Sequence, residues 1–234
     1  MQLPDVTLAA LSSVCVYETV RAMKYSMREI QFGDSVFVSH RKPFYLPDDI
    51  RFERTAKLKN IDDFNYKILF EFYKYIKTEF VLLIHYDGFV INPEMWRPEF
   101  LDYDYIGSPW ADGVQKDFYG NTVRVGNGVS IRSKKLLELP RRLDLPFKYG
   151  EGHANHEDTY ICCRYRHILA GNGIKYAPLE VAKYFGHETM IPEIEGINPF
   201  LFHKWRGSNR FYKRFGRRYI KQLLLNLISP KSIF

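Results

Sequence analysis

An uninterrupted apolar run, Phe80–Ile84, leads directly into a short polar segment that contains Asp87. A strand that is apolar on both faces is typical of the centre of a parallel sheet, where helices cover both sides. The preceding segment, Ile61–Ile76, has apolar residues at helical spacing, so we expect a helix there. Because ligands of open α/β sheets bind at the carboxyl ends of the strands, Asp87 is a candidate functional residue.

The N-terminal part of the chain predicts a strand, a helix and a second strand. Apolar residues run from Val6 to Leu11, recur at helical spacing over Tyr17–Met27, and run again over Ser35–Val38. Three later segments are expected to form a strand, a helix and a strand, in this order: Tyr103–Trp110, Thr159–Leu169 and Lys175–Val181. Alternation of strands and helices is typical of a parallel sheet. We therefore predict a single α/β domain with a mostly parallel central sheet over residues 1–207, a size that suits the 234-residue chain.

The basic charge of the chain is concentrated near its C-terminal end. Residues 196–234 hold nine of the 34 Lys and Arg residues and none of the 27 Asp and Glu residues. The whole chain has a formal net charge of +7, so residues 1–195 carry −2 and are nearly neutral. A protein that binds nucleic acid more often has basic residues across its working face, so we expect no nucleic-acid partner.

Residues 208–234 are expected to be a separate basic segment. Aromatic and aliphatic residues recur about every four positions over Asn209–Ile228, at Phe211, Phe215, Tyr219, Leu223 and Leu227. Arg210, Arg214, Arg217, Arg218 and Lys221 are among the basic residues of the same segment and are expected on the other side of the helix. This pattern predicts an amphipathic helix, which either packs on the domain or lies on an anionic membrane surface.

Cysteine content and hydropathy exclude two classes of protein. Three cysteines cannot form a disulfide framework, and none is part of a Cys-x-x-Cys motif. The start of the sequence has no basic region followed by an apolar one, and its longest apolar runs are far shorter than the roughly 18 residues that a membrane span needs. We expect a cytoplasmic protein, at most peripheral on the inner membrane.

Two short motifs are candidates for function. Gly126-Asn127-Gly128 is either a hairpin turn or a place where the backbone approaches a ligand. Glu157 and Asp158 precede a predicted helix, where carboxylates ordinarily cap the first turn. The phosphate-binding loop and the dinucleotide fingerprint are both absent.

Together the motifs form an ordered series that resembles the nucleotide-sugar-dependent glycosyltransferases of the GT-A fold. More closely, the chain is similar to a family of glycosyltransferase-like domains first catalogued as domains of unknown function. The motifs that carry the resemblance are Leu83–Pro93, Asp104–Trp110, Val125–Gly128 with Ser130–Ser133, Glu157–Cys162, Ala177–Ala182 and Pro199–His203. The resemblance extends from about Val6 to Trp205.

The resemblance implies a divalent cation, Mn²⁺ or Mg²⁺, that bridges the enzyme and the donor diphosphate. GT-A enzymes hold it through an Asp-x-Asp motif at a strand end, and the matching tripeptide here is His85-Tyr86-Asp87. Asp87 and the late His203 are therefore the expected metal ligands. Because the first carboxylate is missing, a metal-free variant stays open, and His203 could instead be a packed histidine among aromatic residues.

The resemblance also implies roles for other positions. The general base is expected to be Asp158 or Glu157, with Asp158 slightly favoured. The donor nucleotide is expected at Ala9, Ala10, Leu11, Asp87 and Gly88, and the sugar or acceptor at Trp110, Gly126, Asn127 and Gly128.

These features predict a nucleotide-sugar-dependent glycosyltransferase of the hexosyltransferase type. Its acceptor would be a glycan or a lipid-linked molecule in surface polysaccharide or lipopolysaccharide synthesis. A sugar nucleotidyltransferase is a second possibility, but it needs a glycine-rich, basic loop after the first strand, and Leu8–Val16 is neither. A third is a non-catalytic module that binds a glycan or a protein partner with some of the 38 aromatic residues.

Overall fold

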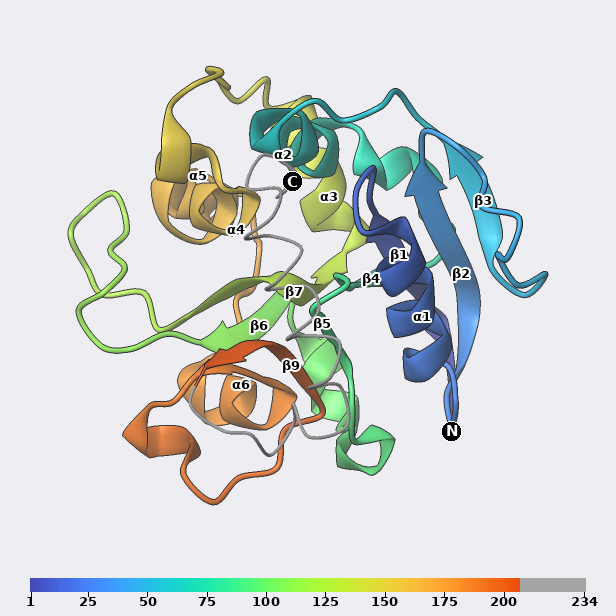
Figure 1. The fold of residues 1–234 in the computed structure, drawn as a ribbon. Coiled ribbons are helices and arrows are strands. Elements are labelled where there is room, and N and C mark those ends of the chain that lie inside the picture. Colours follow the sequence, from blue (N-terminus) through green and yellow to red (C-terminus); the bar gives the residue numbers. More distant parts are fainter. Residues whose placement is uncertain (207–234) are drawn as a thin grey trace.

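A computed structural model describes residues 1–206 of the chain, which are built around a six-stranded sheet (Figure 1). Its strands, in spatial order, are β3 (Arg51–Arg54), β2 (Gln31–Ser39), β1 (Gln2–Leu11), β4 (Phe80–Leu83), β7 (Val125–Ser133) and β6 (Tyr105–Pro109). The first four are parallel, and β7 runs antiparallel to both β4 and β6. The predicted α/β class with a mostly parallel central sheet is confirmed.

A smaller sheet joins three segments that are far apart in the sequence. Its strands are β5 (Gly88–Val90), β9 (Leu201–Arg206) and β8 (Gly186–Thr189), in that order. The central strand β9 is antiparallel to β5 and parallel to β8. Because β5 follows β4 after a short turn, the small sheet begins where the central strand of the large sheet ends.

Six α-helices connect or flank these strands in the described part of the chain: α1 (Val16–Ser26), α2 (Ile61–Phe70), α3 (Lys134–Arg142), α4 (Glu157–Thr159), α5 (Arg166–Gly171) and α6 (Leu179–Phe185). The start of α2 shows why a helix begins there. The Asn60 side chain accepts a hydrogen bond from the backbone N–H of Asp63, which caps the first turn. Figure 1 places α2, α3, α4 and α5 on one side of the central strands and α6 beside the small sheet.

The core explains why Phe80–Ile84 is apolar without interruption. Leu82 belongs to a large apolar cluster on one face of the sheet, whereas Val81 and Leu83 belong to a second cluster on the other face. All three side chains are fully buried. Alternate residues of a strand point to opposite faces, so a strand covered on both sides must be apolar throughout.

Two predictions about local structure are wrong, and one of two open alternatives is excluded. Lys175–Val181 is not a strand: only Tyr176 forms a bridge, to Tyr105, and α6 begins at Leu179. Gly126-Asn127-Gly128 is not a turn but lies inside β7. Thr159–Leu169 is not one regular helix, because a π-helical turn over Tyr160–Arg164 separates α4 from α5.

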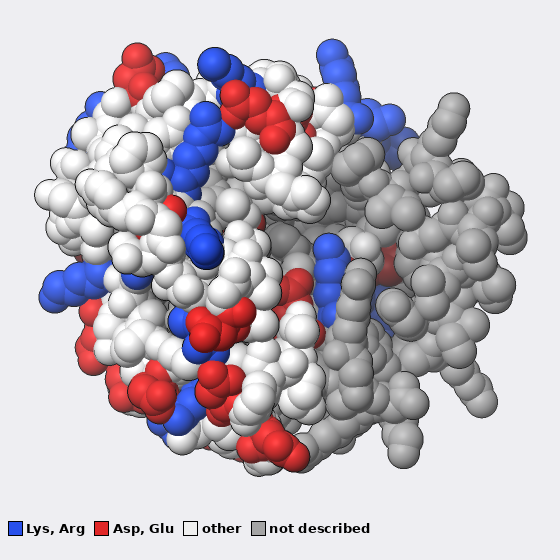
Figure 2. Space-filling model, turned by 90° about the vertical axis from the view of Figure 1, so that its left-hand side faces the viewer, with Lys and Arg blue, Asp and Glu red and all other residues white. Residues whose placement is uncertain are grey.

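The predicted helix at 209–228 lies outside the described residues, and the division of the chain at 207/208 stays a prediction. Within residues 1–206, no helix has the length and apolar character needed to cross a membrane. On the face shown in Figure 2, the basic and acidic side chains of the described residues are interspersed rather than gathered into one basic area.

Candidate functional site

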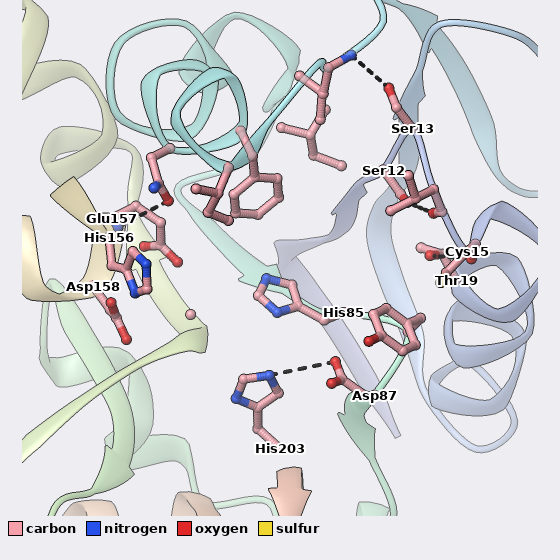
Figure 3. A pocket seen from close by; sticks show the side chains of 18 of the residues that line it. Ser12, Ser13, Cys15, Thr19, His85, Asp87, His156, Glu157, Asp158 and His203 are labelled. Carbon is pink, nitrogen blue, oxygen red and sulfur yellow. Dashed lines mark hydrogen bonds and ion pairs between the residues drawn. The ribbon is translucent and has the colours of Figure 1, made fainter. Parts of the chain in front are cut away.

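A cavity of about 450 Å³ lies beyond the carboxyl ends of β1 and β4. Three groups of residues surround it (Figure 3). One is the loop after β1, the second is the turn after β4 together with β8 and β9, and the third comes from α2 and the start of α4. The cavity is therefore where the topology of an open α/β sheet predicts a ligand.

The turn after β4 brings two potential metal ligands together. The backbone N–H of His85 donates to the carbonyl of Gly88 (2.8 Å), and the N–H of Gly88 donates back to the carbonyl of His85 (3.3 Å). This tight turn places His85 and Asp87, two residues apart, at the cavity. Glycine is required at its end, since a Cβ on Gly88 would lie 2.7 Å from Cδ2 of His203.

The small sheet adds His203 from the far end of the described chain. His203 on β9 is the register partner of Gly88 on β5, so it lies beside Asp87. Its Nε2 is 3.6 Å from Oδ1 of Asp87. Ligand atoms of His85, Asp87 and His203 all lie within 4.8 Å of one another, and we call these three residues the His-Asp-His cluster. The backbone N–H of the next residue, Lys204, donates to the carbonyl of Asp87 (3.0 Å).

Burial and neighbouring charges give the three groups of the cluster different protonation states. Burial and the charge on His203 lower the pKa of His85 to about 3, which leaves its imidazole neutral. Burial alone would also lower the pKa of His203, but the carboxylates of Asp87 and Glu188 outweigh it and raise that pKa to about 9. Burial disfavours the charge on Asp87, yet contact with His203 lowers its pKa to about 2.

The His-Asp-His cluster fits a divalent cation. His203 is only 6% exposed, and within residues 1–206 its ring nitrogens have ion-pair contacts with Asp87 (3.6 Å) and Glu188 (3.3 Å) but no well-formed hydrogen bond. The buried Nε2 of His85 also lacks a hydrogen-bond partner among these residues. Buried polar atoms are almost always satisfied, so a ligand is expected at Nε2 of His85 and Nε2 of His203, the nitrogens that face the cluster. Two imidazoles and one carboxylate are a donor set that divalent metal ions accept.

The acidic pair lies at the start of α4, on the side of the cavity opposite Ser12 and Cys15 (Figure 3). Glu157 is buried and forms an ion pair with Arg132 from β7, which is itself buried. Burial raises the pKa of Glu157 to about 7, although the Arg132 guanidinium opposes the rise. Asp158 is half-buried, and its Oδ1 accepts a hydrogen bond from the backbone N–H of Thr159 (2.7 Å).

Only one of the predicted sugar-pocket residues lines the cavity. Gly128 does so, and a Cβ there would lie 2.7 Å from Cε1 of His85 and 2.8 Å from Oε1 of Glu157. Asn127 is buried behind it. Trp110 covers Gly126, and neither of these two residues lines the cavity. The glycine at position 128 therefore keeps open the space between the His-Asp-His cluster and the acidic pair.

Of the residues expected to bind the donor nucleotide, some line the cavity and others do not. Ala9 and Ala10 are fully buried within β1 and do not line the cavity, whereas Leu11 at the end of β1 does. The loop that follows, Ser12–Cys15, also lines the cavity. The side-chain oxygen of Ser13 accepts a hydrogen bond from the backbone N–H of Leu58 (3.0 Å), which ties this loop to the segment before α2.

Several residues of the site escape prediction from the sequence. Asn65 on α2 accepts a hydrogen bond from the backbone N–H of Glu157 (3.2 Å), and Glu188 on β8 contacts His203. No motif in the sequence marks either residue. His85 is different, because its spacing of two residues from Asp87 at a strand end is the spacing of the Asp-x-Asp motif.

Comparisons with known proteins bear on the fold of the chain. A family model described as "Protein of unknown function (DUF5672)" matches residues 49–203. No curated protein has a significantly similar sequence. An active-site mutant of LgtC superimposes with a TM-score of 0.51 at 13% identity, covering 89% of this chain and 88% of its own. A glycosyltransferase involved in the glycosylation of the major capsid of PBCV-1 gives 0.50 at 11%, covering 91% and 98%. Both are GT-A-type structures, so the predicted fold is confirmed.

Proposed function

The chain belongs to the DUF5672 family of proteins of unknown function, and we propose that it is a glycosyltransferase that uses a nucleotide-sugar donor. The observation that carries this proposal is the His-Asp-His cluster in the middle of a cavity at the strand ends of a GT-A fold. A cavity of about 450 Å³ is of the size that holds a small ligand.

The charges around the cavity support a metal-bound diphosphate. Among the described lining residues, four are carboxylates and two are positively charged at neutral pH, Lys204 and His203; the carboxylates are Asp87, Glu157, Asp158 and Glu188. A free diphosphate would be repelled by this surplus of negative charge. A divalent cation on Asp87 and His203 would reverse the local charge and attract the diphosphate. A site that binds the diphosphate with a divalent cation is therefore better supported than one that works without a metal ion.

The three sides of the cavity suggest how a donor would lie (Figure 3). The loop Ser12–Cys15 would contact the nucleoside, because it lies on the side opposite the acidic pair. The cluster and Lys204 would hold the diphosphate between them. The sugar would then reach toward Glu157 and Asp158, whose carboxylates accept hydrogen bonds from hydroxyl groups.

Transfer would require a base on the acceptor and charge stabilisation on the leaving group. We propose that Asp158 takes the proton of the acceptor hydroxyl, because Asp158 is only half-buried, whereas Glu157 is buried and paired with Arg132. Asp87 and His203 would hold the metal ion, which when bound neutralises the charge that develops on the departing diphosphate. Lys204 would add a positive charge at the same place.

The amide variants Asp158→Asn and Glu157→Gln separate base catalysis from structural capping. Asp158→Asn is expected to lower kcat by about 100-fold or more and to leave donor affinity unchanged, because the base acts on the acceptor alone. Steady-state kinetics with both substrates would measure this. Equal and modest losses in the two variants would instead show that the pair only caps α4.

Binding of nucleoside diphosphates tests the proposal without knowledge of the acceptor. Titration calorimetry with UDP, GDP, dTDP and ADP, each with and without Mn²⁺, should find one diphosphate that binds only when Mn²⁺ is present. A sugar nucleotidyltransferase would prefer the nucleoside triphosphate. A non-catalytic glycan-binding module would bind none of these nucleotides, and either outcome would contradict the proposal.

We also propose that the acceptor is a glycan or a lipid-linked molecule of surface polysaccharide or lipopolysaccharide synthesis, met at an anionic membrane. Support comes from the basic and aromatic sequence of residues 209–228. Truncation after Gly207 is expected to abolish binding to anionic liposomes, with each basic residue worth about 1 kcal/mol near the surface. Flotation would measure the loss, and binding by the full chain should weaken as salt is added. An unchanged melting temperature would show that the truncated protein is folded, whereas retained flotation would refute a membrane role for these residues.

A further inference from the structure

We propose that Glu188 positions His203 as a metal ligand and that His85 replaces the missing first carboxylate, so that the site selects a transition-metal ion over Mg²⁺. This inference deepens the proposed function and rests on its metal-assisted chemistry. It concerns the ligands themselves, however, and metal binding by the protein can be measured without donor or acceptor.

The contact between Glu188 and His203 comes from the pairing of β8 with β9. Oε1 of Glu188 lies 3.3 Å from Nδ1 of His203, on the side of the ring away from Asp87. The carboxylate thus faces one ring nitrogen while Nε2 faces the cluster. A metal-binding histidine commonly has its other nitrogen held by a carboxylate, which sets the tautomer and the orientation of the ring.

Glu188 is itself held in place by a buried amide. Nδ2 of Asn127 donates a hydrogen bond to Oε2 of Glu188 (2.9 Å), and Oδ1 of Asn127 accepts one from the backbone N–H of Val129 (2.9 Å). Asn127 lies inside a strand but has a φ of 120°. Residues other than glycine rarely adopt a positive φ. The hydroxyl of Tyr105 donates to the carbonyl of Asn127 (2.6 Å) and supports this conformation. The chain of contacts from Tyr105 to His203 is therefore anchored in the central sheet.

Asn127 was expected to contact the sugar or the acceptor. Its side chain instead donates a hydrogen bond to Glu188, which in turn contacts His203 of the His-Asp-His cluster. Its conformation is then explained by this contact, since a strained backbone persists only where the surrounding structure holds it.

The donor set decides which metal ion fits. Mg²⁺ prefers oxygen ligands in octahedral geometry, and an Asp-x-Asp motif supplies them. Here His85 and His203 contribute imidazole nitrogen, and Asp87 is the one carboxylate of the cluster. Imidazole favours first-row transition-metal ions over Mg²⁺. Mn²⁺ is a practical probe because it accepts both donor types and gives an electron paramagnetic resonance signal.

Glu188→Gln tests the positioning role through metal affinity. Titration of the purified, metal-stripped chain with Mn²⁺ alone should show a single site in the wild type and an affinity about 10- to 100-fold weaker in the variant. Glu180→Gln is a matched control, because Glu180 is exposed and pairs with Lys183 on the surface of α6. The control should bind Mn²⁺ like the wild type. Equal affinity in wild type and a folded Glu188→Gln variant would overturn the positioning role.

Competition with Mg²⁺ tests the selectivity and does not depend on Glu188→Gln folding. An approximately hundredfold excess of Mg²⁺ should leave most of the Mn²⁺ bound to the wild type. His85→Asp restores an Asp-x-Asp motif and should let Mg²⁺ displace Mn²⁺ far more readily. Ready displacement from the wild type, or no Mn²⁺ site at all, would overturn the inference. If Mn²⁺ binds as expected but no nucleoside diphosphate does, the proposed function fails and the metal site stands.

Discussion

Replacing Asp87 by alanine is expected to abolish sugar transfer while leaving the fold intact. Asp87 is the one carboxylate of the His-Asp-His cluster and lies in the turn between His85 and Gly88, directly after β4. Its loss removes a ligand of the proposed metal and leaves His203 without one of its two carboxylate neighbours. A loss of about a hundredfold or more in kcat/KM is expected if Asp87 holds the ion that stabilises the leaving diphosphate.

The matched control for this variant is Asp112→Ala. The Asp112 side chain is 78% exposed and lies near Arg124, away from the cavity lining. The Asp112→Ala variant should therefore have the same turnover as the wild type. Circular dichroism and a thermal melt on both variants show whether they fold, and chelation of the wild type with EDTA should reproduce the loss. Turnover like the wild type in a folded Asp87→Ala variant would remove Asp87 from the site.

Arg132→Met is expected to give the largest loss of stability of any single change in the site. Arg132 and Glu157 form an ion pair with side chains only 1% and 4% exposed. Breaking such a pair from one side leaves an uncompensated buried charge, which typically costs about 3–5 kcal/mol in the free energy of unfolding. Arg132 also donates to the hydroxyl of Ser130 (2.9 Å), and methionine cannot replace that bond. Chemical denaturation would measure the loss.

The double variant Arg132→Met with Glu157→Gln separates the charge effect from lost packing. It removes both charges together, so it should recover much of the stability that Arg132→Met loses. If the double variant is as unstable as Arg132→Met, the buried charge on Glu157 is not the cause. That result would mean that the guanidinium matters mainly through its bonds to the β7 backbone and to Ser130.

The sequence predicts the central sheet well because the pattern of apolar residues that marks each strand lies within the strand itself. Phe80–Ile84 must be apolar throughout, since its side chains enter two clusters on opposite faces of the sheet. The opening strand, helix and strand follow from the same periodicity. Lys175–Val181 was assigned wrongly because it pairs with β6 only around Tyr176, and α6 begins at Leu179. Apolar composition alone does not show that the pairing is so short.

The candidate site is predictable only where a motif marks it. Asp87 and His85 could be found from their place at the end of a buried strand, and His203 from the resemblance to GT-A enzymes. Glu188 and Asn65 could not, because each reaches the site through a contact between segments far apart in the sequence. Asn127 was assigned to the sugar or acceptor from the resemblance, whereas its side chain donates a hydrogen bond to Glu188.

The measurement that tests the central claim most directly is hydrolysis of a panel of nucleotide sugars by the full chain with Mn²⁺, followed by chromatography of the released nucleotide. The account predicts slow release of a nucleoside diphosphate from one donor, lost on removal of the metal and lost in Asp87→Ala. Release of diphosphate from no donor, while Mn²⁺ is bound and the protein is folded, would contradict it.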